Sequence, residues 1–384
     1  MNLALVIDRF DPSKGGAESY LAALGSWLAT RGHRVAILSQ DAPRPGAGFP
    51  FELRRIGRAG APRPWRDVLF RREAARALGE FDASLGVRGT VGTSVYAPHG
   101  GVYRVAERAN LRSVRSGALR AAKTAARRVS LKHAVLRATD DAAIRSEATR
   151  VLVAVSERVE RDLREALRGR EKRVEVVRNG VDLARFRPEN RLAFRAPWRR
   201  RLGLDDRVPV WLFVAHNFRL KGIDTAIAAL ARPSSAGRDA TLLVAGRGHR
   251  ARAARVAARL GLGGRRVLFA GDVREIDALY AAADVLVHPT HYDPSSLVAL
   301  EAMASGLPIV TTREDGTSEI VRPGVEGEVL ANPGDAAELA AAVERALDPA
   351  RGRRYGAAAR ARAEEWPWER NFAAMEALLA GARA

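Results

Sequence analysis

The sequence predicts an α/β protein of two domains, each built on a doubly wound parallel β-sheet with helices on both faces. Short β-type runs alternate with helical patterns through nearly the whole chain, which is typical of doubly wound α/β units. The runs are apolar throughout, as expected of parallel strands that are buried on both faces. With 384 residues, the chain is also long enough for two cores of ordinary size.

The predicted strands fall into two series. In the first half, the strand at residues 3–8 is followed by an Ala- and Leu-rich helix that extends to about Thr30. The second half has the same pattern, and the sequence contains no repeat with a period of about 20–50 residues. The β-type runs are LALVID (3–8), RVAILSQ (34–40), ASLGV (83–87), VLVAVS (151–156) and VEVVRN (174–179), then VPVWLFVAH (208–216), ATLLVAG (240–246), RVLFAGD (266–272), DVLVHPT (284–290) and PIVTT (308–312).

The segment between about residues 180 and 208 separates the two series. It has no strand periodicity and is dense in Pro, Arg and Asn. We therefore expect an N-terminal domain at residues 1–190 and a C-terminal domain at residues 191–366. Since both halves have the pattern of nucleotide-binding sheets, we expect a ligand cleft between the domains.

The composition excludes several classes of protein. No apolar run approaches the ~20 residues of a membrane span, and the N-terminus MNLALVIDRF has the pattern of a strand instead of a signal peptide. There is no cysteine, which excludes disulfides, thiolate metal sites and cysteine nucleophiles. None of the 7 histidines pairs at the HxxxH spacing of a zinc enzyme, so we expect no metal site. The expected setting is the cytoplasm.

The formal net charge of +20 is the unusual feature of the composition. A field of this size favours anionic partners such as nucleic acid, an acidic membrane surface or phosphorylated substrates. Aromatic residues make up only 6% of the chain and no base-stacking platform is recognisable, so we expect no nucleic-acid partner.

Residues 104–137 interrupt the strand rhythm and predict a long helix or helix pair with a basic stripe. One interpretation is a solvated surface helix, and the other is a helix that lies on an anionic membrane surface. The intervening apolar residues are small and include no Trp or Phe, so insertion would be shallow. The basic residues, mostly three or four apart, are Arg104, Arg108, Arg112, Arg115, Arg120, Lys123, Arg127 and Lys132.

Two loops that follow strands have the residues of anion-binding sites. In SKGGAES (13–19), Gly15 and Gly16 allow a tight turn, and the amides of the following helix can receive an anion. In HNFRLKG (216–222), Arg219 and Lys221 are cations suited to a diphosphate. A purely structural turn and a solvated loop are the respective alternatives.

The stretch THYDPSSLVALEAMASGLPIVTT (290–312) contains the third candidate. Pro294 and the two serines that follow it are good helix-start residues, so a helix is expected from about Leu297 with free amides at its beginning. Asp293 lies just before this helix and Glu301 lies about one turn inside it. Both carboxylates can therefore face one extended ligand, although a capping acid and a surface acid would give the same spacing.

Together, these motifs resemble the retaining GT-B glycosyltransferases of family 4. The resemblance rests on the acid-x7-acid pattern before EAMASGLPIV, the upstream KG, the GGAE turn and the linker NGVDLARFRP, with VAVSERVERDL and EEWPWERNFAAM in matching order. It implies two Rossmann-like domains that face a cleft, with the last helix (367–384) crossing back to complete the N-terminal domain. It also implies a nucleotide-sugar donor held mainly by the C-terminal domain and an acceptor held mainly by the N-terminal one.

The resemblance implies a role for each candidate residue. Glu301 would bind the ribose hydroxyls and Asp293 the hydroxyls of the transferred sugar, while Gly15 and Gly16 would close over the donor. Such enzymes need neither metal nor cofactor and are thought to react by front-face displacement, with retention of configuration. The diphosphate would be held by Lys221 and by the helix start at Ser295, Ser296, Leu297 and Val298.

Two positions make the match inexact, and a third residue, His99, has two interpretations. Asp293 stands where the family has Glu, so its carboxylate has a shorter reach, and Ala215 stands where many members have Arg, which leaves Arg219 to serve the diphosphate. His99, in YAPHGGVYR, is either a catalytic residue facing the donor sugar or a loop histidine with a structural role.

HGGVYR and the basic segment look most like the lipopolysaccharide core glucosyltransferases. We therefore expect transfer of a hexose, glucose being favoured, from a UDP-sugar to a phosphorylated lipid-linked glycan, by a peripheral protein at the cytoplasmic face of the inner membrane. The alternatives are a GT-B nucleotide-sugar epimerase or hydrolase and, in a different class, a basic nucleic-acid-binding protein.

Overall fold

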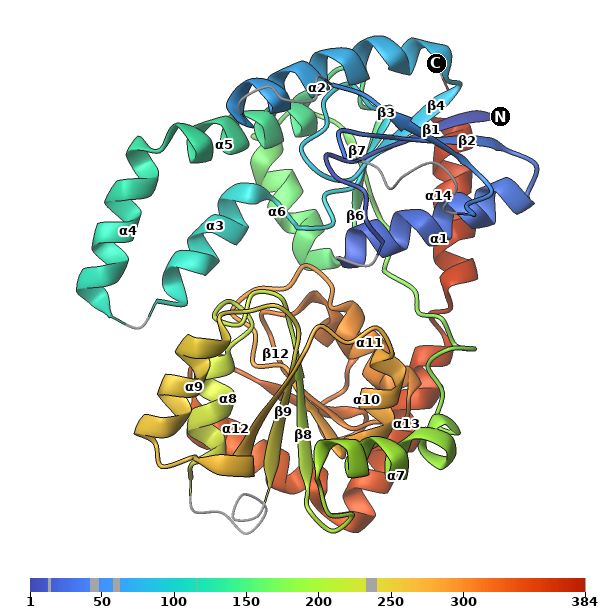
Figure 1. The fold of residues 1–384 in the computed structure, drawn as a ribbon. Coiled ribbons are helices and arrows are strands. Elements are labelled where there is room, and N and C mark those ends of the chain that lie inside the picture. The colour runs from blue at the N-terminus through green and yellow to red at the C-terminus, as the bar shows by residue number, and fades with distance from the viewer. Residues whose placement is uncertain (13–14, 42–47, 58–62, 115, 233–239, 384) are drawn as a thin grey trace. The chain divides into compact units, whose positions relative to one another are not determined.

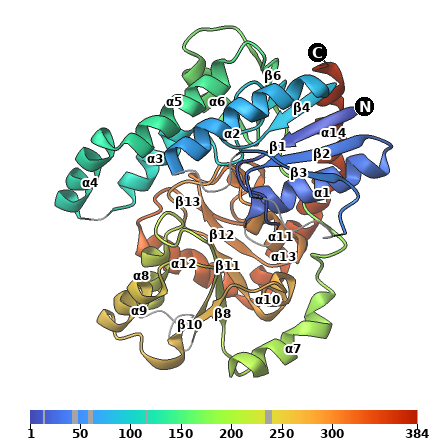
Figure 2. The same cartoon turned by 45° about the horizontal axis from the view of Figure 1, so that its top comes forward.

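The computed structural model describes residues 1–12, 15–41, 48–57, 63–114, 116–232 and 240–383, and it divides into two compact α/β units. The N-terminal unit comprises Met1–Arg108, Ala118–Arg178 and Glu369–Ala384, and the C-terminal unit comprises Ala109–Gly117 and Asn179–Trp368. The division after Arg178 lies earlier than the 190/191 boundary expected from the sequence. In Figures 1 and 2 each unit is a central sheet with helices packed on its two faces.

The sheet of the N-terminal unit has seven parallel strands in the order β3-β2-β1-β4-β5-β6-β7. Five of them were predicted. The other two, β3 and β5, were not predicted because neither is a continuous apolar run. Strand β3 is a half-exposed edge strand of sequence ELRR, and β5 has only two residues. The strands are β1 (Asn2–Val6), β2 (Arg34–Ser39), β3 (Glu52–Arg55), β4 (Ala83–Gly86), β5 (Val95–Tyr96), β6 (Val151–Ala154) and β7 (Arg173–Val176).

The last helix of the chain packs against the N-terminal unit, as expected. The Tyr20 hydroxyl of α1 donates to Asn371 Oδ1 of α14 at 2.8 Å, and Asn371 Nδ2 donates to the Arg178 carbonyl at 2.7 Å. These bonds join segments that are far apart in the sequence, so α14 is part of this unit. The helices here are α1 (Gly16–Thr30), α2 (Arg63–Ala77), the 3-10 turn η1 (Leu78–Glu80), α3 (Tyr103–Arg112), α4 (Gly117–Val129), α5 (Leu131–Arg145), α6 (Glu157–Leu167) and α14 (Trp368–Gly381). The end of α3, from Ala109 onward, is assigned to the C-terminal unit.

The basic segment forms three helices, α3, α4 and α5, where the sequence predicted one long helix or a pair. Breaks before Gly117 and at Ser130, whose φ and ψ of −76° and 114° are extended, separate them. Helix α4 has no buried residue; its last residue, Val129, is 87% exposed, and Leu131, which begins α5, is 69% exposed. Figure 1 shows α4 at the far end of this segment from the β-sheet of the N-terminal unit. Arg115 lies outside the described residues.

The C-terminal unit has a six-stranded parallel sheet in the order β10-β9-β8-β11-β12-β13. Five strands were predicted, and the short edge strand β13 was not. The strands are β8 (Val210–Val214), β9 (Thr241–Ala245), β10 (Val267–Gly271), β11 (Val285–Val287), β12 (Ile309–Thr312) and β13 (Gly327–Leu330). The helices are α7 (Asn190–Leu202), α8 (Ile223–Leu230), α9 (Arg250–Arg259), α10 (Ile276–Ala282), α11 (Leu297–Ala304), α12 (Ala336–Leu347) and α13 (Pro349–Glu364), with 3-10 turns η2 (Gly264–Arg266) and η3 (Gly316–Ile320).

Strand β8 explains why the apolar runs are continuous. Trp211 and Phe213 enter the core on one face of the sheet, while Val210 and Leu212 enter the core on the other face. Both faces are therefore buried, as the doubly wound arrangement requires. Among the described helices, none is long and apolar enough to cross a membrane.

Candidate functional site

The candidate site of the C-terminal unit lies at the carboxyl ends of β8 and β11. The strand order reverses between these two neighbours, since β9 and β10 extend the sheet on one side and β12 and β13 on the other. Ligands of doubly wound sheets bind at such a point, where the loops from adjacent strands diverge. The loop after β8 contains Arg219 and Lys221, and the loop after β11 contains Asp293.

Glycine allows these two loops to meet. Gly222 has a φ of +82°, and a Cβ atom added to it would lie 2.0 Å from the carbonyl oxygen of Pro289. Any other residue would push the loops apart, because neither backbone can yield. The close approach lets Lys221 Nζ donate to the Tyr292 carbonyl at 3.1 Å. The KG pair of the sequence is thus a cation followed by the glycine that positions it.

Asp293 is at the centre of this arrangement. Its Oδ2 lies 2.5 Å from Lys221 Nζ and 3.1 Å from His288 Nε2, and its side chain is 13% exposed. Burial alone would raise the pKa of Asp293, but the Lys221 ammonium and the His288 ring outweigh it and hold the pKa below its usual range. The carboxylate is therefore ionised at any physiological pH and can accept hydrogen bonds from a ligand.

A second buried carboxylate, Asp315, fixes the loop around Asp293. Its Oδ1 accepts from the amides of Thr317 at 2.9 Å and Ser296 at 3.2 Å, and its Oδ2 accepts from the Thr311 hydroxyl at 2.9 Å. Burial, followed by the charge of nearby Asp293, raises the pKa of Asp315. Because it is fully buried and bonded on both oxygens, Asp315 positions the site and is not available to a ligand.

Helix α11 begins at Leu297, as predicted, and Ser296 is its N-cap, with Oγ accepting from the Ala299 amide at 3.2 Å. The Ser296 amide is occupied by Asp315, while no described residue accepts from the amides of Leu297 and Val298, which are in the first turn. Ser295 Oγ lies 3.5 Å from Thr317 Oγ1. Of the predicted helix-start residues, Leu297 and Val298 therefore have the backbone amides that can bind an anion, and both residues are half-buried.

Glu301 lies one turn further along α11, in a different environment from Asp293. Its Oε2 accepts a hydrogen bond from the Tyr280 hydroxyl of α10 at 2.7 Å. Burial raises the pKa of Glu301 to about 7, although the bond from Tyr280 opposes the shift. Glu301 is thus partly protonated near neutral pH, whereas Asp293 is not.

Of the two predicted cations, Lys221 forms the ion pair with Asp293. Arg219 is half-buried in the same loop, and its Nη2 donates to Asn110 Oδ1 at 2.8 Å, within the same compact unit. Ala215, at the position where the family often has Arg, is 8% exposed at the end of β8.

The candidate residues of the N-terminal unit form a separate group after β1, β4 and β5. Gly15 is the extended N-cap of α1, and a Cβ atom added to it would lie 2.4 Å from Glu18 Oε2, so glycine makes room for this carboxylate. Arg88 Nη1 lies 3.5 Å from both Asp8 Oδ1 and Glu18 Oε1. Gly16 begins α1, and Ser13 and Lys14 of the predicted turn lie outside the described residues.

His99 packs on Tyr20 of this unit, with 4.5 Å between ring centroids and a 46° tilt. Burial, followed by the nearby Arg88 charge, lowers the pKa of His99 to about 4. The imidazole is therefore neutral at physiological pH, so it can form hydrogen bonds but carries no charge.

Sequence reasoning missed His288, Asp315 and Tyr280. The first two were detectable in principle, because each is a polar residue that follows a buried strand, at the edge where the site lies. Tyr280 gave no such signal, since it is a buried aromatic in a helix that also packs on the core. Among the described residues, no group of three or more His, Cys, Asp or Glu side chains could hold a metal ion.

Each half of the chain matches the model of a glycosyltransferase family. Residues 14–185 match the model described as Glycosyltransferase Family 4, and residues 208–349 match that described as Glycosyl transferases group 1. The two matches follow each other along the chain and cover most of both units.

Curated relatives match about half of the chain. A glycogen synthase of Mycobacterium tuberculosis is 39% identical over 207 residues, which are 51% of this chain and 45% of the relative. The lipopolysaccharide glucosyltransferase WaaG of Escherichia coli is 31% identical over 154 residues, 40% of this chain and 41% of the relative. The matched segments thus span less than half the length of these relatives.

Solved structures match the whole chain. The crystal structure of WaaG, described as a glycosyltransferase involved in lipopolysaccharide biosynthesis, superposes with a TM-score of 0.82 over 99% of this chain and 100% of that chain, at 23% identity. Anabaena HepE in complex with UDP-glucose superposes with a TM-score of 0.75 over 99% and 100% of the two chains, at 19% identity. These matches confirm the two Rossmann-like domains of the GT-B fold.

Proposed function

Because the chain belongs to the family 4, group 1 glycosyltransferases, we propose that it transfers a hexose from a nucleoside diphosphate sugar to a saccharide acceptor with retention of configuration. The observation that carries this proposal is the arrangement around α11. An ionised Asp293 beside Lys221, two first-turn amides and a separate carboxylate on Glu301 offer three different contacts to one extended ligand.

The proposed donor contacts follow from charge and exposure. The amides of Leu297 and Val298, together with Lys221, bind the diphosphate, because a helix start and a cation both favour an anion. Glu301 accepts hydrogen bonds from the ribose hydroxyls. Asp293 accepts hydrogen bonds from hydroxyls of the transferred sugar, and Arg219 contributes a second positive charge from the same loop.

The proposed reaction is a front-face displacement. The bond between the anomeric carbon and the β-phosphate oxygen breaks, the acceptor oxygen attacks from the same face, and its proton passes to the departing phosphate oxygen. Lys221 and the helix amides stabilise the negative charge that grows on the diphosphate. The scheme uses no metal ion or cofactor, since these groups supply the positive charge. From the N-terminal unit, Gly15 and Gly16 close over the donor, and neutral His99 forms a hydrogen bond with the sugar.

We favour UDP-glucose as the donor. HepE binds UDP-glucose and WaaG is a glucosyltransferase by description, which supports this choice. The shorter reach of Asp293 compared with the family's Glu leaves space for a bridging water or a different hydroxyl. The donor is therefore best identified by direct binding.

The proposed acceptor is a phosphorylated lipid-linked glycan, such as lipopolysaccharide core, at the cytoplasmic face of the inner membrane. Helix α4 supports this, because it combines basic residues with apolar residues exposed at its end and has none buried in a core. Substituting Arg120 and Arg128 by Glu should reduce binding to anionic vesicles, while the same change at Arg255 and Arg259 of α9 should not. Equal binding by both variants would contradict the membrane proposal.

The donor proposal is tested by thermal shift against a panel of nucleoside diphosphates and nucleotide sugars. We expect UDP and UDP-glucose to raise the Tm of the wild type and to have little effect on Glu301→Ala. Glu344→Ala, on helix α12 of the same unit, is the matched control and should respond like the wild type. An absence of any shift in the wild type, or an equal shift in Glu301→Ala, would show that the site is wrong.

Product analysis distinguishes the enzymatic alternatives. A transferase consumes the nucleotide sugar faster when acceptor is added, and the new glycosidic bond keeps the anomeric configuration of the donor. Release of free sugar or an epimerised sugar at an acceptor-independent rate would favour the epimerase or hydrolase instead.

A further inference from the structure

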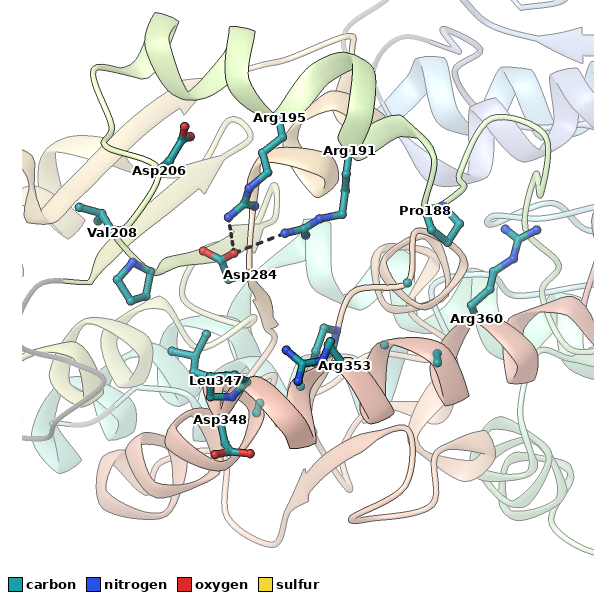
Figure 3. Close-up of a pocket in the computed structure, with 18 of the residues that line it drawn as sticks. Pro188, Arg191, Arg195, Asp206, Val208, Asp284, Leu347, Asp348, Arg353 and Arg360 are labelled. Atoms are coloured by element: carbon teal, nitrogen blue, oxygen red, sulfur yellow. Dashed lines mark hydrogen bonds and ion pairs between the residues drawn. The ribbon is translucent and has the colours of Figure 1, made fainter.

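A cavity of the C-terminal unit lies at the opposite ends of the strands from the site around Asp293. It has a volume of about 870 Å³ and is lined by the segments that precede β8, β11 and β12, with α7 and α13 as walls (Figure 3). Asp284 precedes β11 and lines this cavity, whereas His288 follows β11 and contacts Asp293. The two sites are therefore distinct, although one strand connects them.

The cavity contains more positive charge than its nearest carboxylate can balance. Asp284 forms ion pairs with three arginines of α7: with Arg195 at 2.7 Å, with Arg199 at 2.6 Å and with Arg191 at 3.6 Å. One negative charge thus faces three positive charges at Asp284, while the cavity as a whole is lined, among the described residues, by five arginines and four acids. Such an excess next to a concave surface favours an anion.

The three arginines do not have the same role. Arg199 is 1% exposed and its remaining donors bond to the carbonyls of Ala282, Asp205, Asp206 and Val208, so it is structural. Arg191 and Arg195 line the cavity, with side chains 37% and 22% exposed. Burial, followed by the charge of Arg195, lowers the pKa of Arg191. This crowding of like charges is a cost that a bound anion would relieve.

A further arginine, Arg353 of α13, lies on the opposite wall of the cavity from Arg191 and Arg195 (Figure 3). Among the described residues it has no carboxylate partner. Two of the acids that line the cavity are already engaged, since Asp348 caps α13 through the Arg351 amide at 2.8 Å and Glu364 accepts from Arg360 Nε at 2.7 Å. Three guanidinium groups from two helices thus line one cavity, and Arg191 and Arg195 also donate to the Ala283 carbonyl at 2.9 and 3.2 Å.

We propose that this cavity binds the phosphate group of a small phosphate ester. Guanidinium groups match the oxygens of a phosphate through paired hydrogen bonds, and groups on two walls can hold a dianion from both sides. The volume suits a metabolite of about the size of a hexose phosphate. Pro188, Pro209 and Pro308 line the wall and can contact the carbon skeleton, and exposed Asp206 can accept from a hydroxyl group.

The test is isothermal titration with inorganic phosphate and with a hexose 6-phosphate, using the free hexose as the uncharged control. The pocket variant is Arg191→Gln/Arg353→Gln, with Arg353→Gln alone as a second variant because Arg353 is exposed and its loss should not disturb folding. Arg255→Gln/Arg259→Gln on α9 changes the net charge equally outside the cavity and is the matched control. Lys221→Gln weakens the proposed diphosphate site, which could also take up phosphate.

We expect the hexose 6-phosphate to bind the wild type, the α9 variant and Lys221→Gln with similar affinity. Loss of two charge-assisted contacts should weaken binding to the double pocket variant roughly 100-fold, and the single variant roughly 10-fold. The proposal is overturned by an absence of binding to the wild type, by an equal loss in the α9 variant, or by a loss in Lys221→Gln with full binding in the pocket variants. The last result would place the phosphate at the donor site instead.

Discussion

The two acids of the candidate donor site have opposite electrostatic environments, although they lie eight positions apart. Asp293 is paired with Lys221 and His288, so its pKa lies below the usual range. Glu301 is buried against Tyr280 without a cation within ion-pair distance among the described residues, and its pKa rises to about 7. One carboxylate is permanently charged, and the other changes its charge near physiological pH.

This difference suggests different tasks for the two groups. A carboxylate that forms an ion pair with the proposed diphosphate-binding lysine can couple the sugar to the reacting phosphate, and its loss should affect the chemical step. A carboxylate that lies a helical turn away can contribute to donor affinity only, as a uniform binding interaction does. If the tasks differ, a substitution of Asp293 should lower kcat, whereas a substitution of Glu301 should raise KM for the donor.

The largest effect is expected from Asp293→Asn. The amide has the same shape but lacks the charge, so Lys221 loses its ion-pair partner and the sugar keeps only one, uncharged, acceptor oxygen. We expect kcat to fall about 10²- to 10³-fold, as for the loss of one electrostatic contact to a transition state, and Tm to fall because the charge of half-buried Lys221 loses its carboxylate partner. Steady-state kinetics and calorimetry measure the two effects.

The matched control for this variant is Glu328→Gln, which breaks a half-buried ion pair with Arg345 (2.8 Å) on β13 and α12 of the same unit. It should lower Tm but keep kcat. If the two variants lose kcat equally, the loss for Asp293→Asn reflects stability alone and its proposed role is wrong.

A smaller effect, on a different parameter, is expected from Glu301→Gln. The amide retains one acceptor oxygen but loses the charge that strengthens bonds to the ribose hydroxyls, so KM for the donor should rise about 10- to 100-fold while kcat changes little. Glu344→Gln is the control. A fall in kcat at unchanged KM would contradict the division of tasks between the two acids.

The sequence was sufficient to predict the parts of this site that depend on local chemistry. Pro294, Ser295 and Ser296 are residues that start helices, and α11 begins at Leu297 as expected. Continuous apolar runs predicted the central strands, because burial on both faces leaves no room for polar residues. The missed strands β3, β5 and β13 are short or lie at an edge, where this requirement is weaker.

The partners that determine the charge of each acid could not be predicted in this way. Asp293 depends on a lysine 72 positions earlier, while Glu301 depends on Tyr280 from the preceding helix. The periodicity of the sequence does not predict such contacts, because they result from the packing of separate helices and strands. The motif therefore predicted where the two carboxylates are, but not that only one of them titrates near neutrality.

The pH dependence of donor binding should show this titration. Since the pKa of Glu301 is raised to about 7, the fraction that is ionised, and able to accept two hydroxyl bonds, increases as pH rises through about 7. KM for the donor should fall over this interval in the wild type and stay constant in Glu301→Gln. Asp293 adds no inflection above pH 5, because its pKa is low. A flat wild-type profile would disprove the assignment.

The raised pKa of Glu301 should also lower the stability of the unliganded protein at neutral and higher pH. The pKa of Glu301 is higher in the folded state than in the unfolded chain, so this group does not affect folding well below its ordinary pKa of 4.5, penalises folding increasingly as pH rises from there to about 7, and adds a constant penalty above that. Glu301→Gln should therefore match the wild type in free energy of unfolding at acidic pH and exceed it above neutrality, by at most about 3 kcal/mol. Denaturant titrations of both proteins at acidic pH and above neutrality measure the difference in free energy of unfolding. If wild type and Glu301→Gln are equally stable at both pH values, the prediction is contradicted.

The smallest expected effect is that of Tyr280→Phe, which removes the hydroxyl that donates to Glu301 Oε2 at 2.7 Å and to the Val298 carbonyl at 3.3 Å. The bond to Glu301 favours the ionised carboxylate, so its loss should raise the pKa of Glu301 further and move the fall of donor KM to higher pH, at a cost of about 1 kcal/mol in binding. At high pH the variant should approach wild-type KM, since the carboxylate is then ionised in both. Phe186→Leu, which changes a ring packed against Tyr280 at 5.8 Å without touching the hydroxyl, is the packing control. A displaced profile in the control alone would show that packing, and not the hydroxyl, determines the charge of Glu301.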